Sequence, residues 1–283
     1  MADSKLYRKP PSAYSITNPR VLELYTKRPY WSQDSIEWLE ERTKYLTASP
    51  LAAICRYGRF SSRAELFRKK TSPMLPRMDT AATSHGHTYE PIAIDKYEKE
   101  YDTHVLQFSL VPHDTKTWLA VSPDGITPDG IMIEVKCPYS RKILPAEGYD
   151  PWGCPKQYYP QVQAQLEVCD LEVCHFVQYW HKENHMLVTE IKRDREWWVK
   201  WEPEFKKFWG EVLVFRNSHP DWQTVDHHPP RPKKRALVDL FHESELSPQH
   251  KKMHAMIDQP IIFETDDTLE HTEVEKFNTP IRF

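Results

Sequence analysis

The chain has 283 residues, of which 39% are hydrophobic and 28% charged, and its formal net charge is -3. Such a composition is typical of a globular protein, and no apolar run approaches the roughly 20 residues that span a bilayer. We therefore expect one main domain, no membrane partner and an intracellular protein of the cytoplasm or the nucleus, because residues 1–30 lack the apolar run of a secretory signal. The five cysteines form no CxxC pair, so we expect neither a zinc ribbon nor a disulfide framework.

The first third of the chain is predicted to be mainly helical. Residues 1–32 have no periodic apolar pattern and are predicted to form a loosely structured extension. Four helices are expected after them, because a residue that caps helices well precedes each stretch. They begin after Ser35, after Ser49, after Ser61 or Ser62, and at Asp79, the last running to Tyr101 with a kink at Pro91.

The middle of the chain is predicted to form a sheet. Residues 127–130 (TPDG) are turn formers, and they predict a hairpin between strands 117–122 and 131–136. The other expected elements are strands 104–111, 173–181 and 186–192 and helices 157–168 and 194–217. This order predicts an α/β fold, a three-layer-type sandwich with a central mixed β-sheet flanked by helices.

The regular pattern ends near residue 225. We expect a domain over 33–225, preceded by the extension 1–32 and followed by 226–283, a Pro-containing linker with an acidic, flexible tail. From Asp258 onwards there are seven acidic residues against two basic ones. Because the rest of the chain is mildly basic, the composition permits a nucleic-acid ligand without indicating one.

One expected strand carries two opposite charges on the same face. In IMIEVK (131–136), Glu134 and Lys136 lie two residues apart, so their side chains point to one side of the strand. The hairpin brings Asp124 beside Glu134, and two carboxylates repel each other unless a cation lies between them. Hard oxygen ligands suit Mg²⁺ or Mn²⁺, so a metal site is predicted. The alternative is a surface pair of Glu134 with Lys136, with Asp124 only a turn residue.

A second ion has a candidate ligand in Asp114, ten residues before Asp124. Two divalent ions a few Å apart promote in-line attack on phosphodiesters. Lys136 would then orient the attacking water or offset the charge that develops on the phosphate.

Four motifs occur in a fixed order along the chain. They are WLEERTKYLTAS (38–49), GHTYEP (86–91), SPDG (122–125) with EVK (134–136), and QVQ (161–163). Together they resemble the PD-(D/E)xK nucleases and, within them, the phage lambda exonuclease-like, YqaJ-type viral recombinases. The resemblance covers about residues 33–215 and implies the restriction-endonuclease-like core of that superfamily.

Carried over position by position, the resemblance implies a role for each matching residue. Asp124 would bridge two ions, Glu134 and the Val135 carbonyl would complete one site, Asp114 would serve the second, Glu90 would hold a metal-bound water, and Lys136 would be the catalytic lysine. A terminal 5′-phosphate would be bound by Arg42, Ser49, Ser122 and Gln163. The residues alone allow other roles: Glu90 as an exposed helix acid, Arg42 paired with Glu37 or Glu41, Ser49 as a helix cap and Gln163 as a solvated side chain.

The function that the resemblance implies is a metal-dependent 5′-to-3′ exonuclease. It would degrade linear double-stranded DNA from 5′-phosphorylated ends and leave 3′ single strands for viral-type recombination or genome processing. The implied partners are double-stranded DNA, a single-strand annealing protein and further copies of the chain in a ring-shaped homo-trimer. The alternatives are an endonuclease or DNA/RNA nuclease of the same fold, and a catalytically inactive DNA-binding relative.

Overall fold

The computed structural model describes residues 15–33, 35–58, 61–74, 80–140 and 142–229. Contacts divide the chain into two units, Met1–His228 and Pro229–Phe283. The helices and strands described below belong to the first unit. The expected acidic tail and the expected helix cap Asp79 lie outside the described residues.

The described strands form two sheets, whereas a single central sheet was predicted. One sheet has the order β1-β3-β2 and the other the order β4-β5-β6-β7. Within the larger sheet, β5 and β6 are parallel while the outer pairs are antiparallel, so the sheet is mixed as predicted. The strands are β1 (Leu46–Thr47), β2 (Val111–Pro112), β3 (Leu119–Val121), β4 (Gly125–Ile126), β5 (Ile131–Lys136), β6 (Val173–Trp180) and β7 (His185–Lys192).

The helices begin close to the predicted positions. Ser35 caps α2 by accepting the Trp38 N–H, and Ser62 forms a capping box with Glu65 at the start of α4. The α-helices are α1 (Pro19–Lys27), α2 (Ile36–Thr43), α3 (Leu51–Ile54), α4 (Arg63–Lys70), α5 (Ala81–Tyr101), α6 (Tyr159–Cys169) and α7 (Arg195–Ser218). Two short 3₁₀ helices are η2 (Ala146–Tyr149) and η3 (His181–Glu183).

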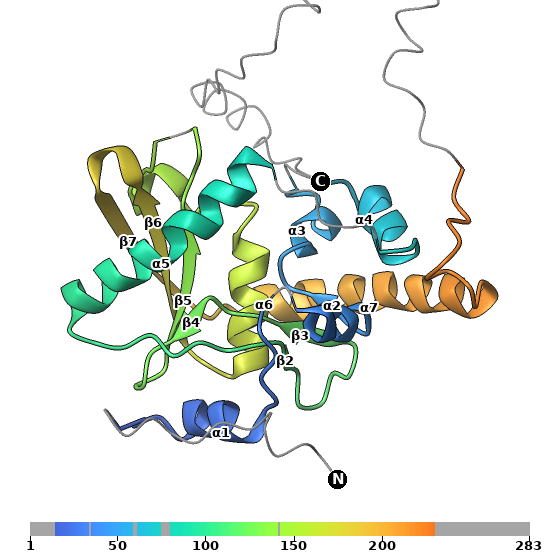
Figure 1. Ribbon diagram of the computed structural model, residues 1–283, viewed down its shortest axis with the longest axis horizontal. Coiled ribbons are helices and arrows are strands. Elements are labelled where there is room, and N and C mark those ends of the chain that lie inside the picture. Colours follow the sequence, from blue (N-terminus) through green and yellow to red (C-terminus); the bar gives the residue numbers. More distant parts are fainter. Residues whose placement is uncertain (1–14, 34, 59–60, 75–79, 141, 230–283) are drawn as a thin grey trace, which may run out of the picture. The chain divides into compact units, whose positions relative to one another are not determined.

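Helices cover both faces of the larger sheet, which confirms the predicted α/β fold class. Figure 1 shows α5 running across this sheet. Ile133 and Val135 of β5 pack in a cluster with Ala93 and Tyr97 of α5. The alternate residue Met132 belongs to the main core, together with residues of α6 and α7. Because strand side chains alternate, Glu134 and Lys136 share the face of Met132.

The predicted turn at 127–130 is confirmed, because it joins two antiparallel strands, but the predicted pairing of 117–122 with 131–136 was wrong. The strand β3 pairs with β1 and β2, and the short strand β4 pairs with β5 instead. Pro123 lies between β3 and β4, and proline has no N–H for a strand ladder, so the chain leaves the first sheet here. Asp124 therefore lies at the crossing from one sheet to the other.

The expected strand 104–111 is also largely absent. Among the described residues of this stretch, Leu106 makes a single bridge with Ile126, and only Val111 belongs to a strand.

Residues 19–27 form a helix, although a loosely structured extension was predicted there. The Asn18 side chain caps α1 by accepting the N–H groups of Arg20 and Val21, and a proline occupies the first turn. Val21 and Leu24 have 0% and 1% of their surface exposed and belong to the main core. The first described segment is thus part of the domain.

Leu24→Ala is expected to destabilise the protein by about 2–5 kcal/mol, because it removes buried methyl groups and leaves a cavity. Leu22→Ala on the same helix is the matched control, since Leu22 is 38% exposed, and it should change the free energy of unfolding by less than about 0.5 kcal/mol. Urea unfolding of both variants measures the difference. Equal, small effects would show that α1 does not pack on the core.

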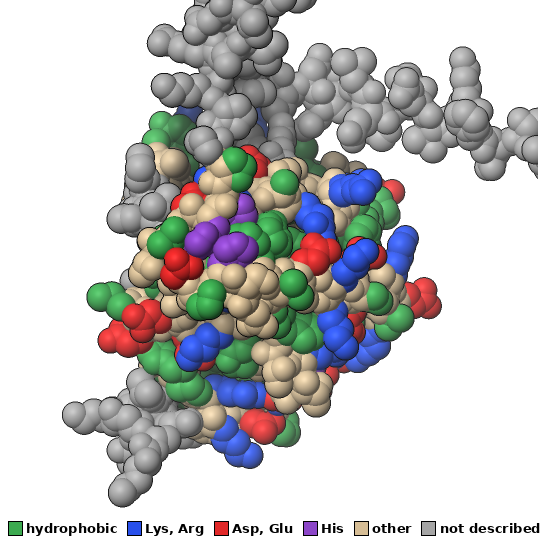
Figure 2. All heavy atoms as spheres, turned by 90° about the vertical axis from the view of Figure 1, so that its right-hand side faces the viewer, with side chains coloured by type: hydrophobic (Ala, Val, Ile, Leu, Met, Phe, Trp, Pro, Cys, Tyr) green, Lys and Arg blue, Asp and Glu red, His purple; other side chains and the backbone are tan. Residues whose placement is uncertain are grey.

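Charges of both signs are mixed on the surface, and the cysteines form no disulfide bonds. Figure 2 shows Lys and Arg side chains interspersed with Asp and Glu over the face at the right-hand side of Figure 1. The five cysteines are all free, and four of them are buried. Among the described residues, no helix has the length and apolar character of a membrane span.

Candidate active site

Glu134 is the most deeply buried acid of the predicted site. It has 0% of its surface exposed, and both of its carboxylate oxygens accept hydrogen bonds. Gln161 Nε2 donates to Oε1 at 2.6 Å, and Gln165 Nε2 donates to Oε2 at 2.8 Å. Lys136 Nζ also donates to Oε1. Two amides and one ammonium therefore satisfy a carboxylate that would be costly to bury alone.

Asp124 reaches the same strand from the crossing between the sheets. Its Oδ2 accepts the backbone N–H of Val135 at 2.8 Å. Burial, and then repulsion by Glu134, raises the pKa of Asp124 well above its ordinary value, and the charge of Lys136 acts in the opposite direction. The two carboxylates thus interact, as the sequence predicted.

Glu90 and Lys136 complete the group, which we call the carboxylate cluster: Glu90, Asp124, Glu134 and Lys136. Burial raises the pKa of Glu90, with Lys136 lowering it and Glu134 raising it. Burial alone would lower the pKa of Lys136, but the charges of Glu134 and Asp124 raise it above its ordinary value. The Lys136 ammonium also lies 5.2 Å from the ring centroid of Tyr158.

A small pocket adjoins the cluster. It has a volume of about 30 Å³ and is lined by Arg42, Thr47, Ala48, Ser49, Ser122, Gln161 and Gln165. Three of the four predicted phosphate ligands, namely Arg42, Ser49 and Ser122, therefore meet in one place. The Arg42 guanidinium lies 4.1 Å from the Trp38 ring centroid. The cap of α3 is Pro50, so Ser49 does not act as the helix cap that was considered for it.

Gln163, the fourth predicted phosphate ligand, faces away from this pocket. It is 1% exposed, its amide donates to the Lys192 carbonyl at 3.0 Å, and its oxygen accepts the Asp194 N–H at 2.7 Å. It fastens α6 to the start of α7. Gln161 and Gln165 face the pocket instead, because residues four apart share one side of a helix whereas residues two apart do not.

Asp114 also lies apart from the cluster, contrary to its predicted role. Its carboxylate forms ion pairs with Arg20 at 2.7 Å and with Arg28. Asp114 lies in the turn that connects β2 to β3. Because these strands are antiparallel, this turn is at the opposite end of β3 from Ser122 and Asp124. The prediction was wrong because the binding partners of Asp114 come from α1, a helix that the sequence analysis missed.

The donor types of the cluster suit a hard divalent ion. Carboxylate oxygens of Asp124, Glu134 and Glu90 and the Val135 carbonyl are the ligand types that Mg²⁺ and Mn²⁺ prefer. In the described part of the chain, no three His, Cys, Asp or Glu side chains are grouped as in a formed metal site. Lys136 bonds to Glu134 directly, so an ion that binds Glu134 competes with this ammonium. Without Asp114, the second predicted ion lacks its assigned ligand.

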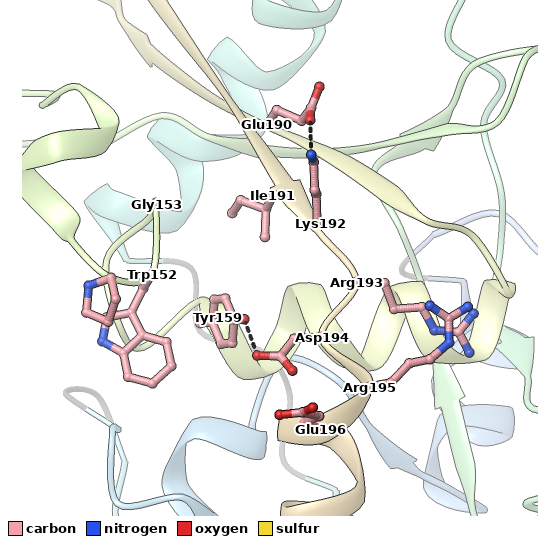
Figure 3. A pocket seen from close by; sticks show the side chains of 11 residues that line it. Trp152, Gly153, Tyr159, Glu190, Ile191, Lys192, Arg193, Asp194, Arg195 and Glu196 are labelled. Carbon is pink, nitrogen blue, oxygen red and sulfur yellow. Dashed lines mark hydrogen bonds and ion pairs between the residues drawn. The ribbon is translucent and has the colours of Figure 1, made fainter.

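A larger cavity lies elsewhere, next to the last residues of β7. Its volume is about 510 Å³. Figure 3 shows the Tyr159 hydroxyl bonded to the Asp194 carboxylate and Lys192 paired with Glu190. Arg193, which also lines it, is paired with Glu167 at 2.7 Å. The charged groups of this cavity are thus largely paired with each other or with neighbouring acids, and the carboxylate cluster does not contribute to its lining.

The family model of the YqaJ-like viral recombinase domain matches residues 37–172. Over these residues, the chain is similar to the YqaJ-like viral recombinase domain. The matched stretch contains every residue of the carboxylate cluster and of the small pocket. The predicted resemblance to YqaJ-type viral recombinases is confirmed.

Two further comparisons find proteins similar to this chain. The uncharacterized protein R354 of Acanthamoeba polyphaga mimivirus is 31% identical over 178 residues, which are 59% of this chain and 32% of that protein. The chain therefore spans about a third of the length of this curated relative. Among solved structures, LHK-Exo, an alkaline exonuclease from Laribacter hongkongensis, is 26% identical, with a TM-score of 0.56. The match covers 66% of this chain and 97% of LHK-Exo. The structure of LHK-Exo with dAMP has the same TM-score and coverage at 25% identity.

Proposed function

We propose that the protein is a metal-dependent exonuclease that degrades linear double-stranded DNA from 5′-phosphorylated ends and leaves 3′ single strands. The observation that carries this proposal is that the small pocket and the carboxylate cluster share two side chains. Gln161 and Gln165 line the small pocket and also hold the Glu134 carboxylate. A phosphate bound in the pocket would therefore lie next to the groups that cut the chain. Similarity to the YqaJ-like viral recombinase domain and to an alkaline exonuclease supports the nuclease chemistry.

The pocket would bind the terminal phosphate through Arg42, Ser49 and Ser122. A guanidinium presents parallel N–H donors that match phosphate oxygens, and stacking on Trp38 restricts its position. The two serine hydroxyls add neutral donors. This chemistry selects a chain end with a phosphate over one that carries a hydroxyl.

The carboxylate cluster would hold the ion through Asp124, Glu134, Glu90 and the Val135 carbonyl. When bound, Mg²⁺ or Mn²⁺ would activate the attacking water and neutralise charge on the phosphodiester. The Lys136 ammonium adjoins these carboxylates, so it can offset the negative charge that develops on the phosphate during attack. Gln161 and Gln165 keep Glu134 oriented.

The experiment is digestion of a linear duplex labelled at either end, with and without a 5′-phosphate, in Mg²⁺ and in EDTA. The proposal predicts metal-dependent loss that begins at the phosphorylated 5′ end. Internal cuts that ignore the phosphate would replace it by an endonuclease of the same fold. Binding without cleavage would indicate an inactive DNA-binding relative.

Arg42→Ala is expected to lower kcat/KM on the 5′-phosphorylated duplex about 10- to 100-fold, because it removes charge-assisted hydrogen bonds to the phosphate. On the same duplex with a 5′-hydroxyl, the variant and the wild type should be nearly equal. Lys44→Ala is the matched control, since Lys44 is a 63% exposed cation at the end of the same helix. An equal loss on both duplexes would remove Arg42 from phosphate recognition.

The ring-shaped trimer and the annealing-protein partner stay predictions from the family resemblance. Light scattering of the full chain, with and without DNA, measures the number of copies.

A further inference from the structure

A group of aromatic rings in tilted and edge-on contact lies on the other side of β5 from α6. It consists of His85 and Tyr89 of α5, Tyr139 after β5 and His181 after β6, and we call it the aromatic–histidine cluster. The ring centroid of His85 lies 4.5 Å from the ring centroid of Tyr89 and 4.5 Å from that of His181. The ring centroids of Tyr89 and His181 lie 4.6 Å apart. Tyr139 meets His85 edge-on at 5.4 Å. Three separate segments of the chain thus converge here.

The aromatic–histidine cluster adjoins the carboxylate cluster through two segments. Tyr89 directly precedes Glu90 on α5, and Tyr139 is the third residue after Lys136. A hydrogen bond joins the His85 ring to the backbone of Pro138, which lies between Lys136 and Tyr139. A strand of DNA that crosses the carboxylate cluster towards the end of β5 would reach these rings next.

The side chains of the cluster suit a flat ligand with polar edges. Tyr139 is 53% exposed, so a ring can stack on it. Among the described residues, His85 Nε2 and His181 Nδ1 have no hydrogen-bond partner although both atoms are buried. Lys182 lies 5.4 Å from the ring centroid of the adjacent Trp180, which adds a cation at the border of the cluster. Aromatic faces with nearby cations bind nucleobases in single strands, because every base offers a π-face.

We propose that the aromatic–histidine cluster binds a nucleobase of the DNA strand beside the cleavage site, with Tyr139 as the stacking ring. The inference rests on the proposed function only in taking DNA as the ligand. A cluster that merely held the loop after β5 would not need a half-exposed tyrosine. A site for phosphate would present cations at its centre rather than at its border.

The test measures binding by the full chain in EDTA, where cleavage does not occur. The probes are 5′-phosphorylated duplexes with a short single-stranded end, intact or with one base removed at successive positions near that end. For wild type, removal of the base at one position should weaken binding about tenfold. Tyr139→Ala should lose this sensitivity and Tyr139→Phe should retain it. Tyr101→Ala is the matched control, because Tyr101 is 43% exposed and ends the same helix α5.

A crosslink identifies the contact directly. With 5-iododeoxyuridine at the sensitive position, irradiation should attach the DNA to the peptide that contains Tyr139, and Tyr139→Ala should abolish this product. The proposal is overturned if no base position affects binding, or if Tyr139→Ala weakens intact and abasic duplexes equally. A protein that crosslinks through Tyr139 but never cleaves DNA in Mg²⁺ would refute the proposed function alone. Cleavage without any base sensitivity would refute this inference alone.

Discussion

Asp124→Asn is expected to abolish metal-dependent cleavage, with a fall in kcat of at least about 1000-fold, or about 4 kcal/mol. The neutral amide cannot donate a charged oxygen to a divalent ion, whereas its side-chain oxygen can still accept the Val135 N–H. Because burial and repulsion by Glu134 raise the pKa of Asp124, the charged side chain is disfavoured in the folded protein. The variant should therefore unfold at no lower temperature than the wild type in EDTA.

The measurement is a single-turnover cleavage assay in Mg²⁺, paired with thermal unfolding in EDTA. Asp129→Asn is the matched control, because Asp129 also precedes a glycine but lies exposed in the turn before β5. It should keep cleavage within about twofold of wild type. Retained cleavage by Asp124→Asn would remove Asp124 from the chemistry, and a large loss of stability would make the result a folding effect.

Lys136→Met should lower kcat about 100- to 1000-fold, the cost of losing one group that stabilises transition-state charge. Methionine keeps the length of the side chain and removes its ammonium. Lys136→Arg, which keeps a positive charge, should lose less. Both effects should appear in kcat rather than in DNA affinity, because the charge that Lys136 offsets develops during attack.

Lys136→Met also leaves the wholly buried Glu134 with only its two amide donors. A lower unfolding temperature is expected for this reason, since a buried carboxylate loses its counter-charge. Circular dichroism at the assay temperature separates this effect from catalysis. Wild-type kcat in a folded Lys136→Met protein would exclude a catalytic lysine at this position.

Helix caps predicted most helix starts well, because a cap bonds to backbone groups within one turn of the chain. Ser35 and Ser62 cap the helices that were predicted after them. The same kind of signal was overlooked at Asn18, where a cap and a following proline precede α1. The division into two sheets was not predicted, because strand pairing joins residues far apart in the chain. Pro123 was the available sign that one ladder ends there.

The residues of the carboxylate cluster were easier to predict than those around them. Glu134 and Lys136 share a strand face by simple alternation, and Asp124 reaches that strand by a short turn. The predicted phosphate-binding role of Gln163 was inconsistent with helical spacing. That spacing places Gln161 and Gln165 on one side of α6 and Gln163 on another. The position of Asp114 depends on Arg20 and Arg28, which lie more than 80 residues earlier, so no local pattern predicted it.

In the proposed function, Gln161 and Gln165 lie between the bound phosphate and the bound ion, so the binding of one would affect the binding of the other. Each amide belongs both to the lining of the pocket and to the support of Glu134. A phosphate in the pocket would change the affinity of the carboxylates for an ion by some factor. By linkage, the bound ion would change the affinity of the pocket for phosphate by the same factor. Under the proposed function, recognition of a chain end and binding of the ion would be two coupled equilibria rather than independent steps.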